Sequence, residues 1–173
     1  FIAVYYLINE NKNFFKFFFI FFSCTLFFLI FDSLFQFYFK FNIFGNVLST
    51  NRVSSFFGSE LILGSYLARL TPIYFSLLYL LYSKNKYFDL INFISILLFF
   101  IVIITSGERV SIFINILFTF IYLFFLYLNK INKIIIPMLS IFVTFLLFIY
   151  LNNNIKFRIL NFSYSQIFLS ANT

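Results

Sequence analysis

Residues 90–128 read LINFISILLFFIVII, then TSGER, then VSIFINILFTFIYLFFLYL: two apolar runs separated by one short polar turn. About 17–25 apolar residues in a helix cross the hydrocarbon core of a bilayer, and the helix pairs every backbone group within the segment. Both runs therefore predict membrane-spanning helices, of which the first is the shorter. The turn between them predicts that the two helices run antiparallel.

Similar runs occur along the rest of the chain. Residues 14–31, 61–82 and 134–151 are long enough to cross a bilayer, whereas the run at 1–8 is too short and is interpreted as the tail of an earlier span. We therefore predict an all-α, polytopic transmembrane helix bundle with about five complete spans plus that tail. Residues 1–173 are expected to form a single transmembrane domain truncated at both ends, with an outer loop at 32–60 and the start of a second at 152–173.

The composition excludes a soluble globular fold. The chain has 173 residues, of which 63% are hydrophobic and only 10% charged, more apolar surface than a protein of this size can bury. The net charge of +7 would suggest nucleic acid in a soluble protein, but these cations sit between apolar runs, so we expect no nucleic-acid partner. With one cysteine, Cys24, and no histidine, neither a metal site nor a cofactor is expected.

The polar breaks alternate in character along the chain. Three short breaks carry paired lysines, which predicts that they face the cytoplasm. The long segment 32–60, the turn at 105–109 and the tail from residue 152 then fall on the outer side. The paired lysines are Lys12 and Lys16, Lys84 and Lys86, and Lys130 and Lys133.

The arginines divide differently from the lysines. All four of them fall on or toward the predicted outer side. Arginine presents a planar, permanently charged fork that binds phosphate oxygens with two hydrogen bonds, so an outward group of arginines suits an anionic, lipid-linked substrate. A chance division of so few residues is the alternative. The four are Arg52, Arg69, Arg109 and Arg158.

Arg69 lies about 8 residues into its predicted span, roughly 12 Å along the helix axis. A cation at that depth is costly and marks a candidate functional residue. Helical spacing puts it on one narrow face, which we expect to point into the protein. Close packing of small residues explains Gly58, Ser65 and Ser76 on this face but not the arginine. The face comprises Gly58, Ser65, Arg69, Pro72 and Ser76.

A second polar face begins beside the TSGER turn. Thr105 and Glu108 fit the T-x-x-E capping box, in which each side chain satisfies a backbone amide of the first helical turn. Arg109 follows directly and is expected at the membrane rim. The second polar face comprises Ser111, Asn115, Thr119 and Tyr122.

Three stretches carry a family resemblance. They are DSLFQFYF at 32–39 with the following Phe44-Gly45, NRVSSFFGSELILGSYL at 51–67, and TSGER at 105–109. In this order and topological setting the chain resembles the O-antigen polymerase and O-antigen ligase superfamily of bacterial membrane glycosyltransferases. The resemblance covers roughly residues 30–125, the central part of such a protein.

The resemblance implies an activity and a location. It implies transfer of a glycan from an undecaprenyl-pyrophosphate carrier to a sugar acceptor, either a glycan chain or the lipid A core, without a metal. The reaction would take place at the periplasmic face of the bacterial inner (cytoplasmic) membrane, in which this chain would be a multi-pass protein surrounded by lipid. Carried over by position, Arg52, Arg69 and Arg109 would hold the donor pyrophosphate, while Glu60 and Glu108 would orient them.

The chain departs from this family in one respect. Ligases of this kind use a histidine in a later periplasmic loop, and this sequence has none. We therefore favour the interpretation that truncation removed the catalytic loop and left an inactive fragment, and the alternative is that Glu60 or Glu108 acts as the base. A lipid-linked oligosaccharide flippase or similar transporter, or a non-catalytic membrane scaffold subunit, remain the rival functions. Polymerase and ligase are not distinguished, nor is the sugar identified.

Overall fold

In a computed structural model, the structure describes residues 13–48, 52–128, 130–151 and 156. These residues form long helices without a β-strand, which confirms the all-α prediction. The predicted tail of an earlier span at 1–8 and nearly all of the predicted second outer loop at 152–173 lie outside the described residues. The elements are α2 (Phe14–Phe39), the short 3-10 helix η1 (Ser55–Phe57), α3 (Leu63–Tyr82), α4 (Phe88–Ser106), α5 (Arg109–Leu126) and α6 (Asn132–Leu151).

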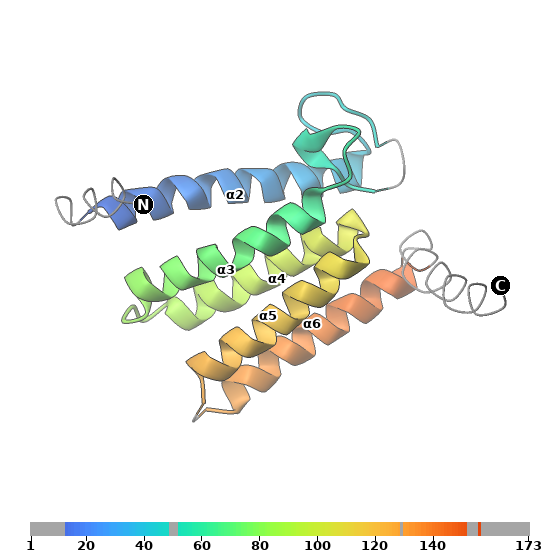
Figure 1. Ribbon diagram of the computed structural model, residues 1–173. Helices are drawn as coiled ribbons and strands as arrows, with labels where there is room; N and C mark the ends of the chain where they lie inside the picture. The colour runs from blue at the N-terminus through green and yellow to red at the C-terminus, as the bar shows by residue number, and fades with distance from the viewer. Residues whose placement is uncertain (1–12, 49–51, 129, 152–155, 157–173) are drawn as a thin grey trace, which may run out of the picture.

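The helices run back and forth between two ends of one bundle, as Figure 1 shows. At one end, which we call the lysine end, lie the start of α2 and the turns that join α3 to α4 and α5 to α6. At the other end lie the α4–α5 turn and the described residues 40–48 and 52–62, which fold over the end of α2 and are here named the cap. The predicted alternation of lysine-bearing breaks with outer segments therefore agrees with the order of the helices.

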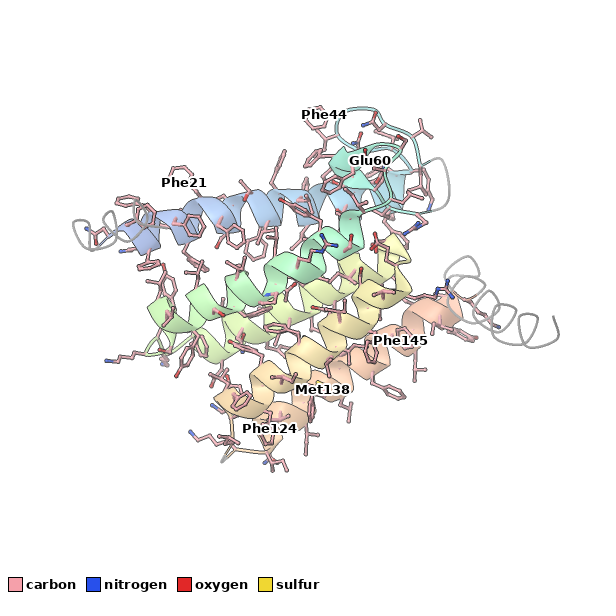
Figure 2. The ribbon with its side chains drawn as sticks, viewed as in Figure 1. Phe21, Phe44, Glu60, Phe124, Met138 and Phe145 are labelled. Carbon is pink, nitrogen blue, oxygen red and sulfur yellow. The ribbon has the colours of Figure 1, made fainter. Side chains whose placement is uncertain are left out.

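Four of the described helices, α2, α4, α5 and α6, are long and apolar enough to cross a membrane. Helix α3 has similar length but is less apolar, because it carries Arg69, Thr71 and Pro72. The outside of the bundle is rich in large apolar side chains, such as Phe21 on α2, which is 70% exposed and projects outward in Figure 2. Such a surface is unfavourable in water and suits a lipid environment.

Helix α4 lies at the centre of the bundle and packs against the other four long helices. Its side chains Phe99, Phe100 and Ile103 are completely buried. It was the shortest of the predicted spans, yet more of it is buried than of any other described helix that could cross a membrane. A nearly all-apolar helix of this kind is typical of the interior position in a bundle, where most of the helix surface is in contact with protein.

The first predicted span was too short. It was expected to end at residue 31, but α2 continues to Phe39. Asp32 and Gln36 lie one helical turn apart on α2, and both are completely buried. Polar residues at the end of an apolar run indicated a loop. In the structure these side chains form hydrogen bonds with the cap, so they are accommodated within the helix and α2 continues past them.

The cap is held on α2 by these two side chains. The carboxylate of Asp32 accepts a hydrogen bond from the hydroxyl of Ser55. The side-chain oxygen of Gln36 accepts from the amides of Ser54 and Ser55, at 3.0 and 2.7 Å. Asn42, also completely buried, donates to the carbonyl of Ser55 at 3.0 Å. Buried backbone groups of an irregular segment need such partners, so these side chains determine where the cap sits.

We expect the Gln36→Ala variant to loosen the cap while the helices remain assembled. Two buried amides lose their acceptor, and each unsatisfied group costs about 1–3 kcal/mol. Limited proteolysis in detergent should therefore cut within residues 40–62 at least about tenfold faster than in the unmodified protein. Tyr38→Ala, at an exposed position on the same helix, serves as the control. Equal cleavage of the two variants would refute this role of Gln36.

Candidate functional site

The TSGER turn forms the tight connection that the sequence predicts. Gly107 ends α4 with a positive φ of 67°, and its amide donates to the carbonyl of Ile104 at 2.9 Å. This left-handed backbone conformation favours glycine, because a side chain would clash with the following peptide. Glu108 then has an extended backbone and is the N-cap residue of α5. The turn therefore places the Glu108 side chain at the cap end of the bundle.

The carboxylate of Glu108 binds the start of a different helix. Its two oxygens accept hydrogen bonds from the amides of Gly64 at 3.2 Å and Ser65 at 2.8 Å, in the first turn of α3. The hydroxyl of Ser111 donates to the same carboxylate at 2.8 Å. The first amides of a helix have no partner within it, and its N-terminus attracts negative charge. Glu108 therefore caps α3 from the neighbouring hairpin.

The predicted capping box of Thr105 and Glu108 is wrong. The hydroxyl of Thr105 instead donates to the carbonyl of Val102 at 2.9 Å, and the start of α5 has no side-chain cap bond. The reason lies in α3, whose N-cap residue is Ile62. The isoleucine side chain has no acceptor atom, so the first amides of α3 need an acceptor from elsewhere, and the Glu108 carboxylate supplies it.

Arg52 joins the cap to this carboxylate. Its Nη2 lies 3.7 Å from a carboxylate oxygen of Glu108, and both side chains are mostly buried. Its Nε donates to the carbonyl of Ser106 at 2.7 Å, and Nη2 donates to that of Leu61 at 3.3 Å. We call this arrangement the Glu108 clasp: the Glu108 carboxylate, Arg52, and the amides of Gly64 and Ser65. It connects the cap, the start of α3 and the α4–α5 turn.

Gly64 allows the close approach that the clasp requires. A Cβ atom at this position would lie 3.2 Å from Cβ of Glu108 and would overlap the hydroxyl oxygen of Ser106. Any larger residue would therefore push α3 away from the α4–α5 turn. Gly64 was part of the stretch that carried the family resemblance, but its role was not predicted, because nothing in the sequence indicates which backbone it faces.

Arg69 lies one turn after Ser65 on α3, about 6 Å further along the helix axis. It belongs to an exposed strip that also includes Tyr66, Ile73 and Ser76. The predicted polar face around Arg69 was expected to point into the protein, and within the described residues this is wrong. The opposite faces of α3 carry the apolar side chains that pack on α2, α4 and α5, so the Arg69 face is left on the outside. Gly58 lies outside the helix altogether, at the end of η1.

The other proposed site residues lie at the same end of the bundle. Arg109 is the first residue of α5 and is half-buried beside Glu108. Glu60 is exposed in the cap, where Figure 2 labels it, and forms no ion pair with the described residues. Arg158 lies outside the described residues. The structure thus brings Arg52 and Glu108 together, has Arg109 directly after Glu108 at the start of α5, and leaves Glu60 outside the ion pair.

The second predicted polar face lies on one side of α5, as expected. Ser111, Asn115 and Thr119 are buried, and Tyr122 donates from its hydroxyl to the side-chain oxygen of Asn92 on α4 at 3.2 Å. The side-chain oxygen of Asn115 is buried without a partner among the described residues. Polar side chains between apolar helices hydrogen-bond across the interface, and this face therefore contributes to helix association.

No protein-family model, curated protein or solved structure matches the chain. The candidate site therefore rests on its own geometry.

We expect Glu108→Gln to destabilise the bundle by about 2–3 kcal/mol, because a neutral amide loses the ion pair and replaces one acceptor oxygen with a donor. A reversible unfolding titration in mixed micelles measures this change. Glu60→Gln is the matched control and should change the free energy of unfolding by less than about 0.5 kcal/mol. Equal free energies of unfolding for the two variants would show that the clasp does not stabilise the bundle.

Proposed function

We propose that the protein transfers a glycan from an undecaprenyl-pyrophosphate-linked donor to a sugar acceptor at the periplasmic face of the bacterial inner membrane, as a polysaccharide polymerase or ligase. The observation that carries the proposal is the exposed Arg69, which lies on a helix between apolar neighbours and one turn below the Glu108 clasp. A lipid-linked diphosphate is an anion that can contact a membrane protein near the end of a span, where Arg69 lies.

The proposal takes α3 as a fifth span. Helix α3 has 20 residues, about 30 Å, which matches the hydrocarbon thickness. It packs between helices that are long and apolar enough to cross the membrane, and it begins and ends at the same two ends as they do. Its lower hydropathy comes from Arg69 and a few small or polar residues, which are the ones a functional span retains.

Arg69 requires an anionic or aqueous partner in this setting. It lies six residues after the start of α3, about 9 Å along the axis, and its side chain is exposed. A guanidinium facing lipid there extends toward the interface, where phosphate groups lie. Its fork binds two oxygens of a phosphate at once, which fits a pyrophosphate better than a single carboxylate.

The chemistry follows from fixed positive charge. Transfer of the glycan leaves negative charge on the departing pyrophosphate, and cations already in place stabilise that charge without reorganising. Arg69 and Arg109 are the proposed contacts. Arg52 already binds two carbonyls and Glu108, so we assign it a positioning role that holds the cap against the start of α3.

The two glutamates are not equally suited to act as the general base. The oxygens of Glu108 already accept from two amides and a hydroxyl and face Arg52, so Glu108 serves the clasp. Glu60 is exposed and unpaired among the described residues, so it is the better candidate of the two for deprotonating an acceptor hydroxyl. The proposed partners remain the lipid-linked donor, the acceptor glycan and membrane lipid.

The test uses the full-length protein in a strain that depends on it for surface polysaccharide. We expect Arg69→Ala and Arg109→Ala to lower polymer formation by about 10²–10³ with normal membrane insertion, because each removes a charge that stabilises the leaving group. Arg69→Lys should retain part of the activity, since it keeps the charge and loses the fork. Lys84→Ala, an exposed charge at the lysine end, is the control and should have no effect.

Two other results would count against the proposal. Unchanged polysaccharide in both alanine variants would exclude these arginines from the reaction. Accumulation of the lipid-linked donor on the cytoplasmic side would instead identify a flippase, because a transferase defect leaves the donor on the periplasmic side.

A further inference from the structure

The lysine end contains a pocket that the proposed activity does not use. It has a volume of about 600 Å³ and lies between the α3–α4 turn and the α5–α6 turn. Its polar lining residues include Ser83, Asn85, Asp89, Lys130 and Lys133. The cap and the Glu108 clasp are at the opposite end of the bundle, so this pocket is separate from the candidate site.

The pocket is lined by two lysines and a single carboxylate. The carboxylate of Asp89 forms an ion pair with Lys133 and accepts a hydrogen bond from the hydroxyl of Tyr127. Burial, together with the hydrogen bond to Asp89, raises the pKa of Tyr127, so its hydroxyl remains a donor. Lys130 is exposed and forms no ion pair within the described part of the chain. Asp89 also interacts with Lys130 through its charge, but one carboxylate cannot neutralise two lysines, so the pocket keeps a net positive charge.

The charges around the pocket increase its attraction for anions. Two further lysines, Lys84 and Lys86, are exposed in the turn beside it. Asp89 is the only acidic side chain among the described residues of these two turns and the helix ends that they join. The neighbourhood thus carries four lysines against one aspartate, an excess of positive charge that favours phosphate.

The remaining walls indicate a lipid and not a soluble anion. Phe125 and Leu128 line the pocket and are exposed, and they continue into the apolar outer surface of α5. Four tyrosines gather at this end of the helices, an arrangement typical of the boundary between the hydrocarbon and the headgroups. A lipid there can place its acyl chains on the apolar wall and its phosphate among the lysines. The tyrosines are Tyr79, Tyr82, Tyr87 and Tyr127.

We propose that this pocket binds the headgroup phosphate of an anionic phospholipid, with Lys130 as the principal contact. Lys133 adds positive charge to the pocket although it is paired with Asp89. Ser83 and Asn85 offer hydrogen bonds to the rest of the headgroup. The bound lipid would join the α3–α4 and α5–α6 turns. This role goes beyond anchoring the topology, which needs lysines in these turns but no pocket.

The test is native mass spectrometry of the purified chain in detergent, titrated with phosphatidylglycerol or with phosphatidylcholine of the same acyl chains. We expect tighter retention of phosphatidylglycerol and about fivefold weaker binding in Lys130→Ala, the factor that corresponds to roughly 1 kcal/mol for one lysine near an anionic lipid. Lys130→Arg should restore binding. Lys16→Ala removes the same charge from an exposed position at the same end and outside the pocket, so it should bind like the unmodified protein.

Soluble glycerol phosphate, added as a competitor, separates a lipid from a free phosphate. We expect no displacement of phosphatidylglycerol at concentrations up to about 1 mM, because the acyl chains supply much of the affinity. Displacement by glycerol phosphate below that concentration would overturn the lipid assignment. Equal retention by Lys130→Ala and Lys16→Ala, or equal affinity for the two lipids, would overturn the site itself. None of these outcomes depends on polysaccharide synthesis, so the proposed activity is tested separately.

Discussion

The N-cap residue of α3 is Ile62, whose side chain cannot accept a hydrogen bond from the first amides of the helix, and the Glu108 carboxylate supplies the missing acceptor. Near the end of an apolar helix an unsatisfied amide is expensive, so this single interaction constrains three segments at once. The α4–α5 turn must bring Glu108 to α3, Gly64 must lack a side chain, and the cap must deliver Arg52 to balance the carboxylate. The depth of Arg69 follows, because it is fixed relative to Ser65 by one turn of helix.

This arrangement separates the roles of the arginines. Arg52 is occupied by Glu108 and by the carbonyls of Ser106 and Leu61, so it holds structure. Arg69 is exposed on the outer side of α3, and this is the feature on which the proposed recognition of a diphosphate rests. The lysine end presents a different chemistry, in which a pocket of point charges and tyrosines suits a phospholipid headgroup. The two proposals thus give the two ends of the bundle different means of binding phosphate, an arginine fork at one end and lysine charges at the other.

The sequence predicted the all-α class, the alternation of the polar segments between the two ends of the bundle, and the TSGER turn. Local hydropathy determines the first two, and a glycine determines the turn. It failed where the partner of a residue comes from a distant segment. Thr105 and Glu108 fitted a local capping box. Glu108 instead caps α3, because the N-cap residue of that helix, Ile62, has no side-chain acceptor. Asp32 ended an apolar run and indicated a loop, yet Asp32 and Gln36 have partners in the cap and α2 continues past both. The direction of the Arg69 face was also predicted wrongly, because periodicity defines a face and not its neighbours.

The most direct test of the Glu108 clasp is a double-mutant cycle of Arg52→Gln and Glu108→Gln, with the free energy of unfolding measured in mixed micelles. Since both side chains are mostly buried and share one arrangement, their effects should not add. We predict a coupling energy of about 1–3 kcal/mol, with the double variant less destabilised than the sum of the two single variants. Additive effects, with no coupling between the two positions, would contradict the clasp as the interaction that organises this end of the protein.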